Sequence, residues 1–150
     1  WTKKGNETHF GYKDHAKVDA DSKLVTDYAV TSVNVHDSNE FENFFDEKDE
    51  AAYADSAYVG KELPKHVRNE VCEKGYRNKP LTAEQKENNR RKSKIRCRIE
   101  HVFGYMTMSM HGLTVRTIGM RRAVFNIGLT NLVYNLCRYS ILKRKELAEG

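Results

Sequence analysis

Residues 8–33, THFGYKDHAKVDADSKLVTDYAVTSV, contain the two most strand-like segments of the chain, separated by a turn. In the first segment, 8–19, apolar and polar residues alternate, which is the period of a strand with one buried face. The second segment, 24–33, is rich in β-branched residues, and the DADSK before it has the composition of a turn. The stretch therefore predicts an antiparallel β-hairpin.

The residues that follow the hairpin predict two short helices on either side of one more strand. Residues 36–47 resemble a short helix with a phenylalanine-rich face. The apolar stretch 51–54 is typical of a buried strand, which would end at Asp55. A helix over about 61–74 is expected next.

The C-terminal part of the chain predicts long helices. Thr82 begins one of them, because TAEQ matches a capping box, and no Gly or Pro interrupts it before Gly104, so we expect it to reach about Met106. Residues 113–118 are expected to be extended or to form a small strand, and a last, mostly apolar helix is expected over about 120–145. A hairpin, a further strand and several helices make a mixed α/β fold.

The length and composition suit a single domain. A chain of 150 residues can bury a core of its own. No run of about 18 apolar residues is present, and the charged start is unlike a secretory signal. The three cysteines, an odd number without a C-x-x-C pair, argue against a disulfide framework and against a zinc site. These features favour a protein of the reducing cytoplasm.

The net charge of +5 conceals a division along the chain. Residues 1–60 contain 6 Lys and Arg against 13 Asp and Glu, whereas residues 61–150 contain 20 against 8. Within the second part, KENNRRKSKIRCR at 86–98 carries seven basic residues and one acid. This distribution suits a polyanionic partner such as nucleic acid, although a solvated basic surface has the same composition.

Asp55 stands where the predicted strand 51–54 ends, and two interpretations of it are open. It caps the turn or helix that follows, since an Asp near a helix start accepts hydrogen bonds from unpaired backbone N–H groups. Alternatively, it is a metal-binding carboxylate at the C-terminal edge of a sheet, where open α/β folds bind their ligands.

Glu100 is the only acid between Glu87 and Glu146, and it lies beside an apolar stripe of the predicted long helix. It is either the ion-pair partner of Arg96, four residues earlier, or a metal ligand. If the long helix packs across the sheet, Asp55 and Glu100 meet. Two carboxylates together with phosphate oxygens suit Mg²⁺ or Mn²⁺, and nucleic acid on the basic helix would supply the phosphates.

The chain resembles the C-terminal part of a bacterial insertion-sequence transposase of the DDE type, whose catalytic domain is ribonuclease H-like. The resemblance rests on WTKKGNETHFGYKDHAKVD, TSVNVHDS, YADSAY, NRRKSKIRCRIEHVFG and IGLTNLVYNLCRY, in that order over essentially the whole chain. It implies a single catalytic domain over residues 1–150, an α/β ribonuclease H-like mixed sheet with flanking helices. By this resemblance Asp55 is the second acid of the Asp-Asp-Glu triad and Glu100 the third.

The resemblance leaves the first acid of the triad without a clear counterpart. In the family it lies on the first strand, ahead of the hairpin, so we expect it upstream of Trp1, with that strand and an N-terminal DNA-binding region. Two positions depart from the family pattern, Ser93 for a tyrosine and Thr107 for a lysine, so contacts with DNA are expected to differ in detail. The candidates for the first acid by residue type alone are Asp14, Asp19, Asp21 and Asp27.

The resemblance also implies an activity, which is metal-dependent phosphodiester cleavage and strand transfer at insertion-sequence ends, with Mg²⁺ or Mn²⁺ as cofactor. The partner is double-stranded DNA, and the active assembly is a homo-oligomer that pairs two DNA ends. His15 and His36 are either groups that support the metal site or ordinary polar contacts. The residues expected to contact phosphates are Arg90, Arg91, Lys92, Lys94, Arg96 and Arg98.

Two other hypotheses stay open. With two acids instead of three, the chain could be a catalytically inactive fragment that binds DNA non-specifically. It could also be a different ribonuclease H-like enzyme, such as a nuclease or a resolvase. Metal-dependent nicking of DNA separates an active enzyme from a fragment that only binds.

Overall fold

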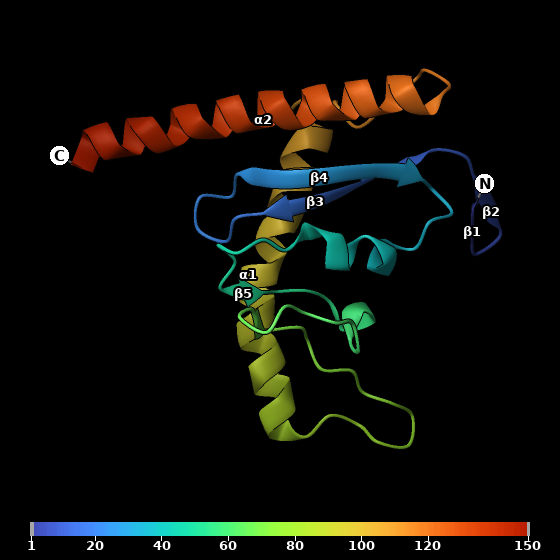
Figure 1. Ribbon diagram of the computed structural model, residues 1–150, viewed down its shortest axis with the longest axis vertical. Helices are drawn as coiled ribbons and strands as arrows, with labels where there is room; N and C mark the ends of the chain where they lie inside the picture. Colours follow the sequence, from blue (N-terminus) through green and yellow to red (C-terminus); the bar gives the residue numbers. More distant parts are fainter. Residues whose placement is uncertain (1, 150) are drawn as a thin grey trace. The chain divides into compact units, whose positions relative to one another are not determined.

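The computed structural model describes residues 2–149 as a mixed α/β protein (Figure 1). The chain divides into two compact units: unit 1 comprises Trp1–His36 and His101–Gly150, and unit 2 comprises Asp37–Glu100. Over the described range, the strands form three small two-stranded sheets. No helix in that range is long and apolar enough to cross a bilayer.

Unit 1 contains the predicted hairpin, which is confirmed. β3 (Tyr12–Val18) and β4 (Val25–Ser32) pair antiparallel and lie side by side in Figure 1. The first predicted strand is nevertheless split, because β1 (Thr2–Lys4) and β2 (Glu7–His9) form a second small antiparallel pair. Gly11 lies at the break, and a glycine inside a strand pattern weakens the strand.

Asp19 organises the turn of this hairpin. Its Oδ2 accepts hydrogen bonds from the backbone N–H of Ser22 at 2.7 Å, from that of Asp21 at 3.2 Å, and from the Ser22 hydroxyl at 2.6 Å. Lys23 has a positive φ of 60°, in the left-handed region that turns use. The turn predicted from DADSK is therefore confirmed, and a local side-chain network holds it.

The core of unit 1 lies where the hairpin meets the end of α1 (Ala83–Met108) and α2 (Met120–Glu149). Its fully buried members, Val102 and Met106, lie one turn apart on one face of α1. Tyr134 of α2 is also buried there. Both long helices are confirmed, and each ends slightly beyond its predicted boundary.

Polar side chains fix α2 along β4, as Figure 1 shows for the two elements. The side chain of Asn135 bonds both backbone groups of Val25: the Val25 N–H donates to Oδ1 at 2.9 Å, and Nδ2 donates to the Val25 carbonyl at 2.8 Å. Arg138 Nε donates to the Ser22 carbonyl at 2.6 Å. These bonds satisfy backbone groups at the start of β4 and so set the position of α2 on the hairpin.

Unit 2 contains the strand that was predicted before Asp55. β5 (Ala51–Ala52) and β6 (Arg68–Asn69) pair in parallel. The pairing continues beyond these residues, since the Cys72 N–H donates to the Ala54 carbonyl at 3.0 Å. Asp55 therefore follows directly on a paired, extended segment.

The helix predicted over 61–74 is wrong. The chain forms β6 and irregular segments there, and Val67 and Val71 are buried. Apolar residues four positions apart fit one face of a helix and one face of a strand equally well, which explains the error. Pro64 also disfavours a helix that begins ahead of it.

The short helix predicted over 36–47 is also wrong as an α-helix. The segment contains two 3-10 turns, η1 (Asp37–Asn39) and η2 (Phe41–Phe44). A single α-helical turn is costly to nucleate, and the phenylalanines find aromatic partners without one. The ring centroids of Phe41 and Tyr58 are 4.6 Å apart.

The start of α1 is the predicted capping box. The Thr82 N–H donates to Gln85 Oε1 at 2.9 Å, and the Gln85 N–H donates to Thr82 Oγ1 at 3.2 Å. The two side chains thus satisfy each other's backbone donors, which is the capping-box arrangement. Residues 113–118, between the helices, form no strand, so the small strand given as one alternative is not found there.

Candidate functional site

Asp55 lies just past β5, with extended backbone angles (φ −71°, ψ 162°), before the 3-10 turn η3 (Ser56–Tyr58). Its carboxylate makes no capping hydrogen bond to that turn. Instead, Oδ1 accepts a hydrogen bond from the Ser56 hydroxyl at 3.1 Å, and the side chain is 59 % exposed. The capping interpretation is therefore wrong, and the carboxylate faces solvent at the end of a strand.

One face of α1 is fixed against the segment that follows β6. The Glu73 N–H donates to Asn89 Oδ1 at 2.8 Å, and Asn89 Nδ2 donates to the Glu73 carbonyl at 2.9 Å. Positions seven and eleven residues after Asn89 lie on nearly the same helical face, because α-helices have 3.6 residues per turn. The contact of Asn89 therefore also orients Arg96 and Glu100.

The Nη1 atom of Arg96 lies between two carboxylates. It donates to Glu100 Oε1 at 2.9 Å, one turn farther along α1, and stands 3.9 Å from Asp55 Oδ2. Because both distances start from the same nitrogen, the distance between Asp55 Oδ2 and Glu100 Oε1 cannot exceed their sum. The interpretation of Glu100 as the ion-pair partner of Arg96 is confirmed. The structure also brings Asp55 beside this pair, while the role of the two acids as metal ligands stays a prediction.

The negative charge and the carboxylate oxygens of the group formed by Asp55, Arg96 and Glu100 are of the type that binds divalent cations. Two carboxylates around one guanidinium leave a net negative charge, and both acids are 59 % exposed, whereas Arg96 is 27 % exposed. Mg²⁺ binds through one or two carboxylates together with waters and substrate phosphates. Within residues 2–149 no group of three or more His, Cys, Asp or Glu is arranged to hold a metal. If Asp55 and Glu100 bind a metal ion, they supply only part of its ligand set.

Four of the basic residues of α1 fall into two pairs. Lys92 Nζ donates to the Val71 carbonyl at 3.0 Å, and Arg96 is held by the acids, so both are directed into unit 2. The side chains of Arg90 and Arg91 are 72 % and 68 % exposed, each 3.7 Å from a glutamate. The predicted phosphate contacts stay predictions, and the two exposed arginines are better placed to make them than Lys92 or Arg96.

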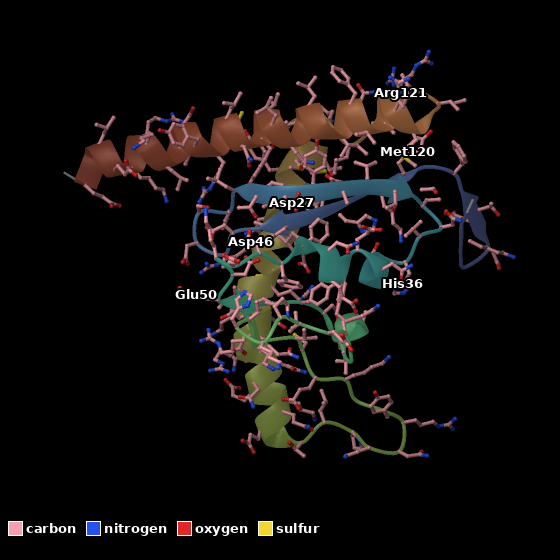
Figure 2. All side chains as sticks on the ribbon, viewed as in Figure 1. Asp27, His36, Asp46, Glu50, Met120 and Arg121 are labelled. Atoms are coloured by element: carbon pink, nitrogen blue, oxygen red, sulfur yellow. The ribbon has the colours of Figure 1, made fainter. Side chains whose placement is uncertain are left out.

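The candidates for the first acid by residue type all belong to unit 1: Asp14, Asp19, Asp21 and Asp27. Asp19 closes the hairpin turn, and Asp27, on β4 (Figure 2), accepts a hydrogen bond from the N–H of Tyr28 at 2.8 Å. Asp14 is different, because Asn131 Nδ2 of α2 donates to its Oδ2 at 3.2 Å. Burial raises the pKa of the Asp14 carboxyl to about 6.

The two histidines named from the sequence also lie in unit 1. His15 is buried, and its Nε2 lies 2.7 Å from Thr31 Oγ1 across the hairpin. This geometry supports the interpretation of His15 as an ordinary polar contact. His36 is exposed at the end of unit 1 (Figure 2).

The residue that sequence analysis missed is Asn89, which anchors α1 beside the site. A signal for it was present, because Asn is disfavoured inside helices and is found there mostly where its side chain has a specific partner. Ser93, noted only as a departure from the family pattern, also has a partner: its Oγ lies 3.8 Å from Cys72 Sγ. A tyrosine ring at this position would need the space between α1 and the paired strands.

The family model described as the transposase DDE domain matches residues 1–136. The chain therefore belongs to the DDE transposase family, and transposase function and DNA binding follow from that membership in general terms. No solved structure matches the chain.

The pKa of Asp14 leads to a prediction about stability. Burial raises this pKa from 3.8 to about 6, so the folded protein holds the proton more tightly than the unfolded chain does. Ionised Asp14 therefore lowers the free energy of unfolding, and this penalty grows between about pH 4 and pH 6. We expect Asp14→Asn, which keeps an acceptor for Asn131, to be more stable than wild type by about 1–2 kcal/mol at pH 7.5, after discounting for solvent.

Urea unfolding of wild type and Asp14→Asn at pH 4 and pH 7.5 measures the effect. Asp27→Asn, on the neighbouring strand, is the matched control and is expected to follow wild type at both pH values. Equal pH dependence of wild type and Asp14→Asn would contradict the assignment of the raised pKa to Asp14.

Proposed function

We propose that the chain is the C-terminal portion of the catalytic domain of a bacterial insertion-sequence transposase, which cleaves and joins DNA with Mg²⁺ or Mn²⁺. The observation that carries the proposal is the convergence of Asp55 and Glu100 on a single nitrogen of Arg96. These two acids would be the second and third members of the Asp-Asp-Glu triad. The positively charged guanidinium of Arg96 lies near both carboxylates, and this supports the idea that a divalent cation would be attracted to the same place.

The side chains of the site have separate tasks in this proposal. Asp55 and Glu100 would hold the divalent cation, and a bound cation would supply a lower pKa for the attacking water or DNA 3′-hydroxyl and stabilisation of the departing 3′-oxygen. The Ser56 hydroxyl and Arg96 orient the two carboxylates beforehand, through the contacts at 3.1 Å and 2.9 Å. No covalent bond between protein and DNA is needed.

The exposed basic residues of α1 supply the binding energy for the DNA backbone. Arg90 and Arg91 project from the helix that carries Glu100, and their side chains are largely exposed. Contacts of this kind fall steeply with salt and carry little sequence information. They would hold the scissile strand close to the acids without choosing its sequence.

The strand edges support a ribonuclease H-like sheet whose first strand precedes this chain. Among the described residues β3 pairs with β4 alone, and β5 pairs with β6 alone. A strand that pairs on one side only leaves an edge at which a further strand could pair. In the proposed domain, a further strand that carries the first acid would precede these strands in the chain.

This part of the proposal predicts what precedes the codon of Trp1 in the coding DNA. We expect an open frame that encodes an apolar, β-branched segment with an embedded Asp, because that segment would be a fully buried strand. Sequencing the DNA upstream of the codon tests it. A stop codon or frameshift directly before Trp1 would contradict the proposal that a working transposase contains this chain.

The activity itself is tested on the protein that includes the upstream residues. Asp55→Asn and Glu100→Gln are each expected to lower Mg²⁺-dependent cleavage of a plasmid carrying the element's ends by about 100-fold or more, because each removes a charged oxygen ligand. Glu84→Gln, which changes an exposed acid in the first turn of the same helix, is the matched control and should cleave like wild type. Full activity of either site variant would contradict the assignment.

A fragment that binds DNA without cleaving it is the second candidate function. It is favoured by the finding that no third acid joins Asp55 and Glu100 in the part of the chain that the structure describes. In that case the 150-residue chain would bind DNA in a salt-sensitive way, and neither Mg²⁺ nor Mn²⁺ would lead to nicking of supercoiled plasmid. Nicking that is lost in Asp55→Asn would exclude this candidate.

A further inference from the structure

A cleft of about 390 Å³ lies in unit 2 between the β5–β6 strand pair and α1. Its polar lining comes from both the strands and the helix, and its apolar member belongs to α1. We call the lining residues the β6 cleft: Tyr53, Arg68, Glu70, Arg91 and Ile95.

The β6 cleft lies on the same face of the strand pair as Asp55. Ala51 is paired with Arg68, and the parallel pairing continues, so Tyr53 and Glu70 stand at the same level. Side chains two residues apart on a strand point to the same face, which places Tyr53 on the side of Asp55. Any ligand of the cleft is therefore a neighbour of the candidate site.

Glu70 holds two arginines of the β6 cleft. Its Oε1 accepts a hydrogen bond from Arg68 Nε at 3.0 Å, and its Oε2 lies 3.7 Å from Arg91 Nη2. The Glu70 side chain is only 13 % exposed, whereas those of Arg68 and Arg91 are 66 % and 68 % exposed. Two guanidinium groups and one carboxylate leave one positive charge in excess, and the part of the cluster that meets solvent is the positive part.

The two arginines keep hydrogen-bond donors for a ligand. The Tyr53 side chain also hydrogen-bonds Arg68, and this contact raises the pKa of the guanidinium above its ordinary value. A guanidinium carries five N–H donors in a rigid fork, and these contacts use only part of them. Two guanidinium groups that are already oriented, with donors left over, suit a phosphate group.

We propose that the β6 cleft binds one phosphate of the DNA backbone through Arg68 and Arg91 together, and that Glu70 is the positioning residue that holds both guanidinium groups in place for it. Two residues of extended strand, from Tyr53 to Asp55, span about 6.6 Å. This is close to the rise of two nucleotides along one strand of B-DNA. A phosphate in the cleft and one at Asp55 can thus belong to the same DNA strand.

The inference rests on the proposed function for the nature of the ligand, which is DNA, but it needs no metal ion. It separates two effects of Glu70 that have opposite signs. If Glu70 only neutralises charge, Glu70→Gln should strengthen DNA binding, because an acid near the phosphates is removed. If Glu70 positions the arginines, Glu70→Gln should weaken binding, because glutamine keeps a single acceptor oxygen and releases one guanidinium.

Fluorescence anisotropy of a labelled, random-sequence DNA duplex, titrated with the 150-residue chain in EDTA, is the test. We expect Arg68→Ala and Arg91→Ala each to weaken binding about tenfold, since each removes a charge-assisted hydrogen bond. The double variant should lose less than the product of the two single losses, because both side chains contact one phosphate. Arg77→Ala, which removes an exposed arginine of unit 2 outside the cleft, is the matched control and should lose less than Arg68→Ala.

Glu70→Gln is expected to weaken binding about threefold or more, because a released arginine must be ordered again when DNA binds. Glu62→Gln makes the same change of charge at an exposed acid of unit 2 and should bind at least as tightly as wild type. Circular dichroism and thermal unfolding check that the variants keep the fold. If Glu70→Gln unfolds, the two arginine variants and their combination still decide, because their side chains are exposed.

Three outcomes would overturn the inference while the proposed function stands. These are a Glu70→Gln variant that folds and binds as tightly as wild type or more tightly, an Arg68→Ala variant that loses no more than Arg77→Ala, and single losses that simply multiply in the double variant. A wild-type chain that does not bind DNA in EDTA would contradict the inference together with the DNA contacts of the proposed function. Loss of cleavage in Asp55→Asn tests the metal site separately.

Discussion

The two hydrogen bonds between the Asn89 side chain and the backbone of Glu73 are the constraint on which the site depends. Glu73 follows Cys72, whose N–H is bonded to the Ala54 carbonyl, and Asp55 is the next residue along that strand. The contact of Asn89 thus ties α1 to the segment that pairs with the one ending in Asp55. Lys92, which donates to the Val71 carbonyl, adds a second contact with that segment, and because the helix is regular, Arg96 then reaches Asp55.

The two interpretations of Glu100 turn out to be compatible. A surface ion pair between Glu100 and Arg96 contributes little to stability, since both groups keep access to water. Its larger effect is to hold the two acids close together. Bringing like charges together is unfavourable unless a cation lies between them, and the guanidinium fills that place in this structure.

Local sequence patterns were enough to predict the hairpin, the strand before Asp55 and both long helices, because strand alternation and the capping box at Thr82 are local signals. The patterns failed over 61–74, where the spacing of Val67 and Val71 fits both a helix and a strand. The strand forms there because it pairs with β5, which is distant in sequence. The same limit applies to the candidate site.

No local sequence pattern predicts that Asp55 and Glu100 lie close together. They were assigned to one site by the family resemblance and not by periodicity. The capping role of Asp55 was plausible by residue type, and only the absence of a side-chain hydrogen bond to the turn that follows excluded it. Asn89 was overlooked because its partner is a backbone group, which leaves no complementary residue in the sequence. The last helix was predicted as mostly apolar, but which of its faces is buried depends on tertiary packing.

The most direct test of the central claim is a titration of the isotopically labelled chain with MnCl₂, followed through the backbone amide signals. Bound Mn²⁺ broadens the signals of nearby nuclei, so a shared site predicts that residues around Asp55 and around Glu100 broaden together, at the same metal concentration. Broadening that begins in the acidic stretch 37–50 and spares either carboxylate would contradict the account, because it would show that Asp55 and Glu100 do not hold a cation in common.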